Sequence, residues 1–258
     1  MYIDSHCHIN FPELAENMPD ILGRMAENKV THALCVSVDL PDFPQVLDLA
    51  ERYPNIFASV GVHPDYPDTV EPSVDDLVRL ADHPKIVAIG ETGLDYFRLE
   101  GDLEWQRERF RTHIRASRAT GKPLIIHTRA AAEDTLRIMA EEGADAAGGV
   151  MHCFTESLAV AEAAIALGFY ISFSGIVTFK SARDLQAVAR AIPLERMLIE
   201  TDSPYLAPVP FRGRTNEPSY VRHVAEFIAT LRDEPLERVA RQTTDNFFNL
   251  FEMARSHA

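Results

Sequence analysis

Cysteine is scarce in this sequence, which argues against a fold held together by disulfides. Three cysteines occur among 258 residues, and Cys7, Cys35 and Cys153 lie in or beside apolar runs without forming a Cys-x-x-Cys pair. A chain of this length with so few cysteines is not a disulfide framework. We expect the three to be small apolar side chains in a reducing compartment. By strand alternation, we expect Cys153 to face away from its neighbour His152.

Basic residues are also fewer than acidic ones. The chain has 25 Lys and Arg against 39 Asp and Glu, which gives a formal net charge of −14 and a pI of about 5.1. A negative overall field repels polyanions, so a broad surface that coats nucleic acid is excluded. A pocket that takes one phosphate or one strand end is still allowed, because bound cations can reverse the local potential.

Long apolar segments are absent as well. The sequence contains no apolar stretch long enough to cross a bilayer, and no basic, apolar leader ahead of the first expected strand, which starts at Tyr2. We therefore expect a cytoplasmic protein with no membrane partner and no obligate protein partner.

What the chain does contain is a regular alternation of strand-like and helix-like segments. Continuous apolar runs, often β-branched, occupy residues 2–3, 33–38, 56–60, 86–89, 124–126, 149–151, 169–173 and 197–199. Between them lie segments with helical spacing, such as residues 104–119, which end before Gly121, and residues 157–167, which start from Ser157 as an N-cap.

This alternation predicts the fold class. Parallel strands covered on both faces appear as continuous apolar runs, and eight strand–helix units favour closure into a barrel. We predict an α/β protein with a TIM-like (β/α)8 barrel, formed by residues 1–258 as a single domain. An open, doubly wound sheet is the alternative, but no Gly-rich phosphate loop follows the first strand.

Histidines gather at the predicted C-terminal ends of the strands. His6 and His8, spaced i and i+2, follow the first strand and share one face; His63, His127 and His152 follow the third, fifth and sixth. Five of the ten histidines thus fall at such positions. Because the C-terminal strand ends of a barrel meet at one mouth, where active sites are built, we expect these imidazoles to converge.

Two carboxylates join them, Glu91 after the fourth strand and Asp202 after the eighth. Such nitrogen and oxygen donors suit Zn²⁺, Mn²⁺, Fe²⁺, Co²⁺ or Ni²⁺, with Mg²⁺ less favoured by imidazole. The candidate ligands are His6, His8, Glu91, His127, His152 and Asp202. Six donors exceed what one catalytic ion needs but suffice for two if Glu91 bridges them. Asp202 can bind one ion and accept a proton from the attacking water.

Arginines near the same mouth are candidates for substrate contact. Arg129 lies two residues past His127, and Arg212 and Arg214 lie in the Pro-rich loop 204–218 that follows the eighth strand. A planar guanidinium can donate two parallel hydrogen bonds to a phosphate, so these side chains suit an anionic substrate.

Short motifs in a fixed order give the chain a family resemblance across nearly its whole length. They are IDSHCHIN at residues 3–10, GETGLDY at 90–96, PLIIHTR at 123–129 with acidic Glu133 after it, HCFT at 152–155, ETDSPYL at 200–206 and TTDNF at 243–247. In this combination and order the chain resembles the TatD family of metal-dependent hydrolases, within the wider amidohydrolase-like barrels.

The resemblance implies a dinuclear divalent-metal site, with Zn, Mg, Mn or Ni as the ions, and deoxyribonuclease activity on single strands or strand ends of DNA, commonly as a 3′–5′ exonuclease. It implies that Glu91, Asp202 and His63 act in catalysis, with His63 also close to the substrate phosphate. The ligand sets that it implies are His6, His8, Glu91 and Asp202 for one ion, and Glu91, His127 and His152 for the other.

Two positions depart from the common family pattern. Glu156 follows the HCFT motif where many members have Gly, which resembles the YcfH-type branch, and Thr215 stands where a second basic residue is frequent. Our favoured hypothesis is attack of a metal-bound hydroxide on a phosphodiester. A metal-dependent ester or amide hydrolase, acting on aminoacyl-tRNA or a small metabolite, is a second hypothesis. A metal-holding interaction protein without turnover is the third.

Overall fold

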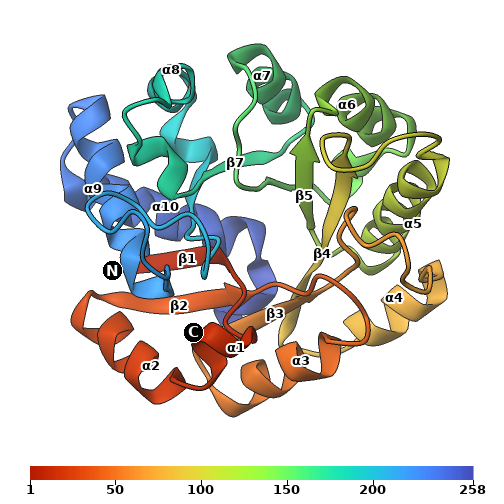
Figure 1. Cartoon of the computed structure of the whole chain (residues 1–258), viewed down its shortest axis with the longest axis horizontal. Helices are drawn as coiled ribbons and strands as arrows, with labels where there is room; N and C mark the ends of the chain where they lie inside the picture. Colours follow the sequence, from red (N-terminus) through yellow and green to blue (C-terminus); the bar gives the residue numbers. More distant parts are fainter. Residues whose placement is uncertain (258) are drawn as a thin grey trace.

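Eight parallel strands form a sheet whose spatial order follows the chain (Figure 1). The computed structural model describes residues 1–257, with side chains described through residue 255. The strands are β1 (Tyr2–Cys7), β2 (Val30–Cys35), β3 (Ile56–Val60), β4 (Ile86–Asp95), β5 (Leu124–Arg129), β6 (Gly149–Met151), β7 (Tyr170–Phe173) and β8 (Met197–Ile199). Every neighbouring pair from β1–β2 to β7–β8 is parallel.

The first strand and the segment after the last one bring the sheet round into a nearly closed barrel. Cys7 forms a parallel bridge with Ser203, and the amide of His8 donates to the Ser203 carbonyl at 2.8 Å. The buried Asp4 strengthens this seam, because Oδ1 accepts the Thr201 amide at 2.8 Å and Oδ2 accepts the Thr201 hydroxyl at 2.5 Å. The predicted TIM-like barrel is confirmed, and Asp4 serves its closure.

Helices surround the barrel, as the ring of ribbons in Figure 1 shows. They are α1 (Pro12–Ala15), α2 (Met18–Glu27), α3 (Phe43–Arg52), α4 (Val74–Ala81), α5 (Glu104–Thr120), α6 (Ala132–Glu141), α7 (Leu158–Ala166), α8 (Arg183–Ala191), α9 (Val221–Arg232) and α10 (Leu236–Leu250). Short 3-10 turns are η1 (Ala144–Ala146), η2 (Gly175–Thr178), η3 (Leu194–Arg196), η4 (Pro218–Tyr220) and η5 (Glu252–His257).

The predicted helix boundaries have clear local causes. α5 ends at Gly121, whose φ of 67° is the left-handed conformation that glycine adopts at a C-cap. α7 starts from Ser157, whose hydroxyl accepts the Val160 amide. Within residues 1–257, no helix has both the length and the apolar character needed to cross a membrane.

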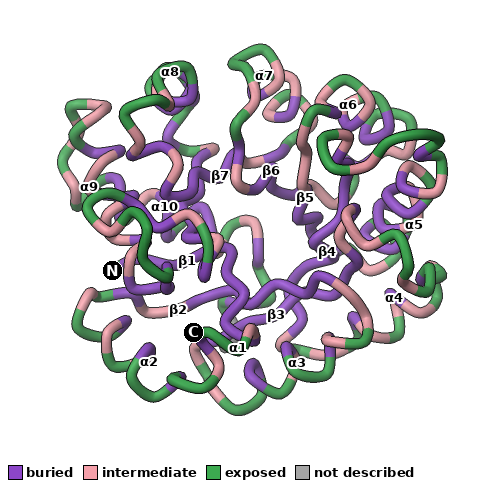
Figure 2. The backbone as a smooth tube through the Cα atoms, viewed as in Figure 1, coloured by how far each residue is buried: buried purple, intermediate pink, exposed green. Residues whose placement is uncertain are grey.

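The core has two parts, and Figure 2 shows the buried tube along the strands. A large cluster fills the space between the strands and the outer helices. A smaller one gathers early strand residues such as Ile3, Val87 and Ile125 with Phe247 and Phe251 from the C-terminal segment. The smaller cluster closes the barrel interior near the strand N-termini, which leaves the C-terminal ends as the open mouth.

Strand β4 is longer than the sequence predicts, and this matters for the site. The apolar run at 86–89 continues as β4 through Asp95, with a register shift between Ile89 and Thr92, after which Asp95 pairs with Arg129. Glycines at positions 90 and 93 made this segment resemble a loop in the sequence. Here Gly93 lies against β5, where a Cβ atom would overlap the His127 carbonyl oxygen. Pairing with β5 therefore keeps Asp95 on a strand rather than on a loop, and the Glu91 amide, at the register shift, donates to the Ser37 carbonyl at 3.0 Å.

Candidate metal centre

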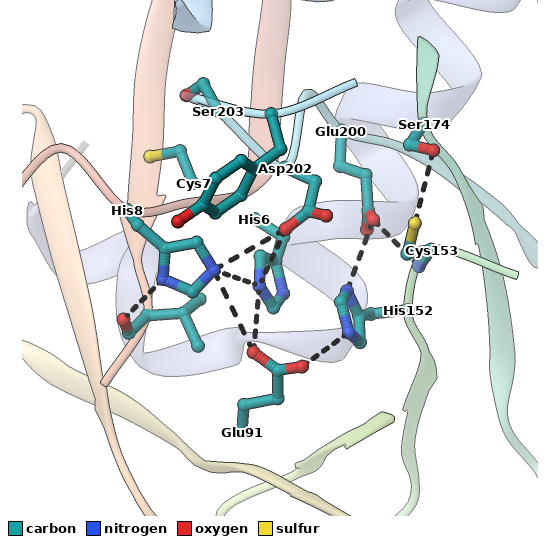
Figure 3. Close-up of polar contacts among 12 residues, drawn as sticks. His6, Cys7, His8, Glu91, His152, Cys153, Ser174, Glu200, Asp202 and Ser203 are labelled. Carbon is teal, nitrogen blue, oxygen red and sulfur yellow. Dashed lines mark hydrogen bonds and ion pairs between the residues drawn. The ribbon is translucent and has the colours of Figure 1, made fainter. Parts of the chain in front are cut away.

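The β1 histidines meet at the barrel mouth, as the two-residue spacing predicts. His6 is fully buried and His8 is nearly so, and their Nε2 atoms lie 3.2 Å apart. Figure 3 shows both rings directed toward the carboxylates of Glu91 and Asp202. Two ring nitrogens this close together, both directed toward the same carboxylates, can bind one cation in common.

Four donor atoms surround that position. His6 Nε2 lies 3.3 Å from Glu91 Oε2 and 3.7 Å from Asp202 Oδ1. His8 Nε2 lies 3.9 Å and 3.5 Å from the same two oxygens. Metal–ligand bonds of about 2.0–2.2 Å in a tetrahedron place neighbouring donors roughly 3.3–3.6 Å apart. The donor set formed by His6, His8, Glu91 and Asp202 therefore has the dimensions of a divalent-metal site.

The other oxygen of Glu91 belongs to a second group of donors. Glu91 Oε1 lies 2.7 Å from His152 Nε2, 3.3 Å from His127 Nδ1 and 3.3 Å from His63 Nε2. Apart from this ion pair with Glu91, His152 Nε2 has no hydrogen-bond partner among the described side chains, which leaves the atom available to a metal ion. Glu91 thus directs one carboxylate oxygen to each donor group.

His63 and His8 differ in the hydrogen bond made by the ring nitrogen that points away from Glu91. His63 Nδ1 accepts the Asp65 amide at 3.0 Å, so the neutral ring carries its proton on Nε2, the atom that faces Glu91. His8 Nδ1 faces the Val36 carbonyl at 3.1 Å, which can only accept, so its Nε2 keeps a free lone pair. His8 is therefore arranged as a ligand, and His63 as a hydrogen-bond donor.

Within the part of the chain that the structure describes, three triads have donor atoms close enough to hold an ion. They are His6–His8–Glu91, His6–His152–Asp202 and His63–Glu91–His127. The structure thus brings all six candidate ligands and His63 to one place, from strands that are far apart in the sequence.

Mutual electrostatics determine the charge of this cluster. Burial raises the pKa of Glu91, but His152, His63 and His6 together hold it well below its usual value. Burial lowers the pKa of His152, yet the charges of Glu91 and Glu200 raise it well above its usual value. The pKa values of His6 and His63 are lowered instead, mainly by burial. The metal-free cluster therefore holds ionised carboxylates beside a protonated His152, whose positive charge a bound cation would replace.

A cavity of about 670 Å³ opens above these donors. Its walls include His8, Phe11, His63, Tyr66, Glu91, Arg98, His127, Arg129, His152, Cys153, Asp202 and Tyr205. The Arg129 guanidinium lies 4.0 Å from the centre of the Phe97 ring, which holds it flat at the rim.

The other two predicted substrate arginines lie away from the cavity. Arg212 stacks over Phe179 at 4.1 Å, and Arg214 lies 5.9 Å from the centre of the Phe211 ring. Among the described residues that line the cavity, neither is present. The loop follows the eighth strand as expected, but its aromatic contacts hold the two guanidinium groups elsewhere.

The prediction that Cys153 faces away from the site is wrong. Cys153 lines the cavity, and its Sγ lies 3.3 Å from Ser174 Oγ. The reason is that β6 ends at Met151, and Cys153 has a φ of 42°, so strand alternation no longer applies. Burial raises the pKa of this thiol well above its usual value, so it stays protonated and is a weak nucleophile.

Two carboxylates at the site were not assigned a role from the sequence. Asp95 Oδ2 lies 3.1 Å from His127 Nε2, and Glu200 Oε1 lies 3.3 Å from His152 Nδ1. Burial raises the pKa of Asp95, but hydrogen bonds from His127 and the Phe97 amide lower it to about 2. Both residues lie in motifs noted in the sequence, at 90–96 and 200–206. The motifs therefore contain the two carboxylates but do not show which histidine each one contacts.

A parallel (β/α)8 barrel whose mouth gathers buried imidazoles and carboxylates defines the class of metal-dependent hydrolases. A family model described as "TatD related DNase" matches residues 3–252. The chain belongs to the TatD family, as its motifs predict.

Three relatives illustrate the match. The "uncharacterized metal-dependent hydrolase YcfH" of Escherichia coli K12 is 46% identical, over 98% of this chain and 97% of its own length. The "3'-5' ssDNA/RNA exonuclease TatD" of Salmonella typhimurium is 31% identical, over 97% and 98%. The crystal structure of YJJV, a TatD homologue from Escherichia coli K12, superposes with a TM-score of 0.91 at 30% identity, covering 97% of this chain and 98% of that one.

Proposed function

We propose that this hydrolase is a phosphodiesterase that removes nucleotides from DNA strand ends, as a 3′–5′ exodeoxyribonuclease with two divalent ions. The observation that carries the proposal is the arrangement of Glu91, whose two oxygens serve separate donor groups 2.7–3.9 Å away. A bridging carboxylate suits a pair of ions, and paired ions are a common solution for phosphodiester hydrolysis. When bound, they would supply activation of a water molecule and neutralisation of phosphoryl charge.

The protein groups around the ions have separable roles. Burial raises the pKa of Asp202, but His8 and His6 lower it below its usual value, so its carboxylate is ionised and can accept the proton of the attacking water. His63 presents Nε2–H toward the cavity and is placed to donate to a phosphoryl oxygen. Arg129, held over Phe97 at the rim, can bind a further phosphate oxygen.

Aromatic side chains at the mouth support a nucleotide substrate. Tyr205 lines the cavity and is 54% exposed, and its ring centre lies 6.3 Å from that of Phe11. Phe11 in turn stacks on His8 with ring centres 5.0 Å apart. An exposed aromatic next to the metal donors offers a base a stacking surface while its phosphate reaches the centre. The exonuclease name of the Salmonella relative supports the same substrate class.

The small number of cationic groups at the mouth favours a second candidate function. Arg98, which pairs with Asp65 at 2.9 Å, and Arg129 line the cavity, whereas Arg212 and Arg214 do not. A small ester or amide substrate needs fewer phosphate contacts than a DNA strand does. A metal-dependent ester or amide hydrolase is therefore the competing proposal.

A cleavage assay on end-labelled single-stranded and duplex oligonucleotides with Mg²⁺, Mn²⁺ or Zn²⁺ tests the nuclease proposal. The wild type should shorten the labelled strand stepwise from its 3′ end. Glu91→Gln should lower the rate roughly 100-fold or more, because several kcal/mol of transition-state stabilisation depend on the ions. Glu162→Gln, the same change on the exposed face of α7, is the matched control.

Two results would count against the nuclease proposal. Cleavage that Glu91→Gln leaves intact would mean that a contaminating nuclease acts. Absence of cleavage by the metal-loaded wild type, together with turnover of ester or amide substrates, would favour the competing proposal.

A further inference from the structure

Asp95, the last residue of β4, determines which nitrogen of His127 is free. Its Oδ1 accepts the amides of Phe97 at 2.9 Å and Arg98 at 3.3 Å, while Oδ2 lies 3.1 Å from His127 Nε2. A carboxylate only accepts hydrogen bonds, so with an ion in place of the proton between His127 Nδ1 and Glu91, the neutral ring would keep its remaining proton on Nε2. The lone pair is then on Nδ1, the atom that lies 3.3 Å from Glu91 Oε1.

Glu200 does the same for His152, from the opposite side of the mouth. It is fully buried, and its Oε1 accepts the Cys153 amide at 2.7 Å and faces His152 Nδ1 at 3.3 Å. With an ion held beside Glu91, the proton of His152 would therefore lie on Nδ1 and its lone pair on Nε2, the atom that is 2.7 Å from Glu91 Oε1 in the metal-free structure. Figure 3 shows Glu200, His152 and Glu91 in this sequence of contacts.

The β1 histidines have no such carboxylate behind them. His8 Nδ1 faces the carbonyl of Val36, and His6 Nδ1 is buried without a partner among the described side chains. A carboxylate behind an imidazole fixes the ring orientation and raises its strength as a metal ligand more than a carbonyl does. The two donor groups of Glu91 are thus supported in different ways.

We propose that Asp95 and Glu200 are positioning residues that hold His127 and His152 as metal-binding tautomers, so that this half of the centre depends on them and the His6/His8 half does not. The inference rests on the metal pair of the proposed function but not on the identity of the substrate. It assigns Asp95 a function beyond the turn that its backbone contacts form.

Asp95→Asn separates the two roles of this residue. An asparagine oxygen can still accept the Phe97 and Arg98 amides, which holds its NH₂ group toward His127 Nε2. That nitrogen must then accept, the ring proton moves to Nδ1, and the lone pair facing Glu91 is lost. The turn is kept while the ligand tautomer is reversed. Glu200→Gln differs, because one amide oxygen can still accept from both Cys153 and His152, so its effect should be smaller.

Calorimetric titration of the metal-free protein with Zn²⁺ measures the effect directly. The wild type should bind two ions, and Asp95→Asn should weaken one of the two steps by about 10- to 100-fold while the other changes less than about twofold. Asp65→Asn is the matched control, because the Asp65 side chain lies at the same cavity but pairs with Arg98, while its contact with His63 is made by the backbone amide, which the variant keeps. It removes the same charge and should leave both steps within about threefold of the wild type.

Nitrogen-15 NMR of the metal-free protein, recorded at a pH high enough to make the His127 ring neutral, supplies a second measurement that does not depend on metal binding. The His127 ring should show a protonated Nε2 in the wild type and a protonated Nδ1 in Asp95→Asn, and thermal unfolding shows whether the variant is folded. Unchanged Zn²⁺ steps in Asp95→Asn, an equal loss in Asp65→Asn, or an unchanged His127 tautomer would overturn the inference.

The same titration separates this inference from the nuclease proposal. If the wild type binds two ions without cutting DNA, the nuclease proposal fails. The inference about Asp95 and Glu200 is then decided by the Asp95→Asn titration alone. If the wild type binds a single ion, the metal pair and this inference fail together.

Discussion

We predict that the free energy of unfolding of the barrel falls at acid pH because of the buried His113. This α5 histidine is fully buried; its Nε2 accepts the Val62 amide at 3.0 Å, and its Nδ1 donates to the Arg109 carbonyl at 2.8 Å. The contact with the Val62 amide needs the neutral ring, because a protonated Nε2 cannot accept a hydrogen bond. Burial lowers the pKa of His113 from 6.5 to about 4. The ring thereby anchors the segment that presents His63 to the cavity.

The sign and size of the effect follow from this pKa. Below pH 6.5 the unfolded chain takes up a proton at His113, whereas the native protein does so only near pH 4. Stability therefore falls as pH drops from about 6.5 to about 4, because the unfolded state binds more protons in that window. At about 1.4 kcal/mol per pKa unit, the full loss is about 3 kcal/mol.

Urea unfolding of the metal-free protein at pH 7 and pH 4 tests the prediction. His113→Gln is the comparison, because glutamine can still accept the Val62 amide and does not titrate. The wild type should lose about 2–3 kcal/mol more than the variant over this range, since every other titrating group is common to both. Equal losses in the two proteins would refute the proposed neutral, buried ring.

Three further predictions concern the site and its support. Affinity for Zn²⁺ should rise with pH through the neutral range. The reason is that carboxylates raise the pKa values of His152 and His127 in the metal-free protein, and the protons on these rings compete with the ion. Titrations at several pH values that give one constant affinity would contradict this prediction. Tyr205→Ala should raise KM for an oligonucleotide about 5- to 10-fold and leave kcat within about twofold of the wild type, because a lost base stack costs about 1–3 kcal/mol. A fall in kcat alone would argue against a stacking role for Tyr205. Gly93→Ala should destabilise the fold by about 3 kcal/mol or more in urea, because φ is +135° and the added Cβ overlaps the His127 carbonyl. Gly23→Ala, in α2 with open space around it, should be neutral or stabilising.

The barrel and the position of its site could be predicted because they follow from local patterns. Continuous apolar runs, helix caps such as Ser157 and the two-residue spacing of His6 and His8 each depend on a few neighbouring residues. Parallel strands in a closed barrel must present their C-terminal ends together, so side chains at those ends converge whatever their sequence separation. Strands β1, β4 and β5 extend further than the apolar runs that predict them, and in β4 pairing with β5 outweighs the loop-like glycines at positions 90 and 93.

The contacts beyond the ligand candidates required the tertiary structure. The sequence does not show that Asp95 lies behind His127, that Glu200 lies behind His152, or that Asp65 holds the proton of His63 on Nε2. Each depends on ångström-scale distances between segments as many as 48 residues apart. The same holds for Arg212, which lies in the expected loop but stacks on Phe179.

The sequence by itself therefore determined the barrel, the family and the convergence of the candidate metal ligands at the mouth, because repeating local patterns and strand topology suffice for these. Only the tertiary structure decided which oxygen of Glu91 meets which histidines, which ring nitrogen carries each proton, and which arginines reach the cavity. Hydrogen bonding changes steeply over tenths of an ångström, and residue order along a chain does not specify distances that fine.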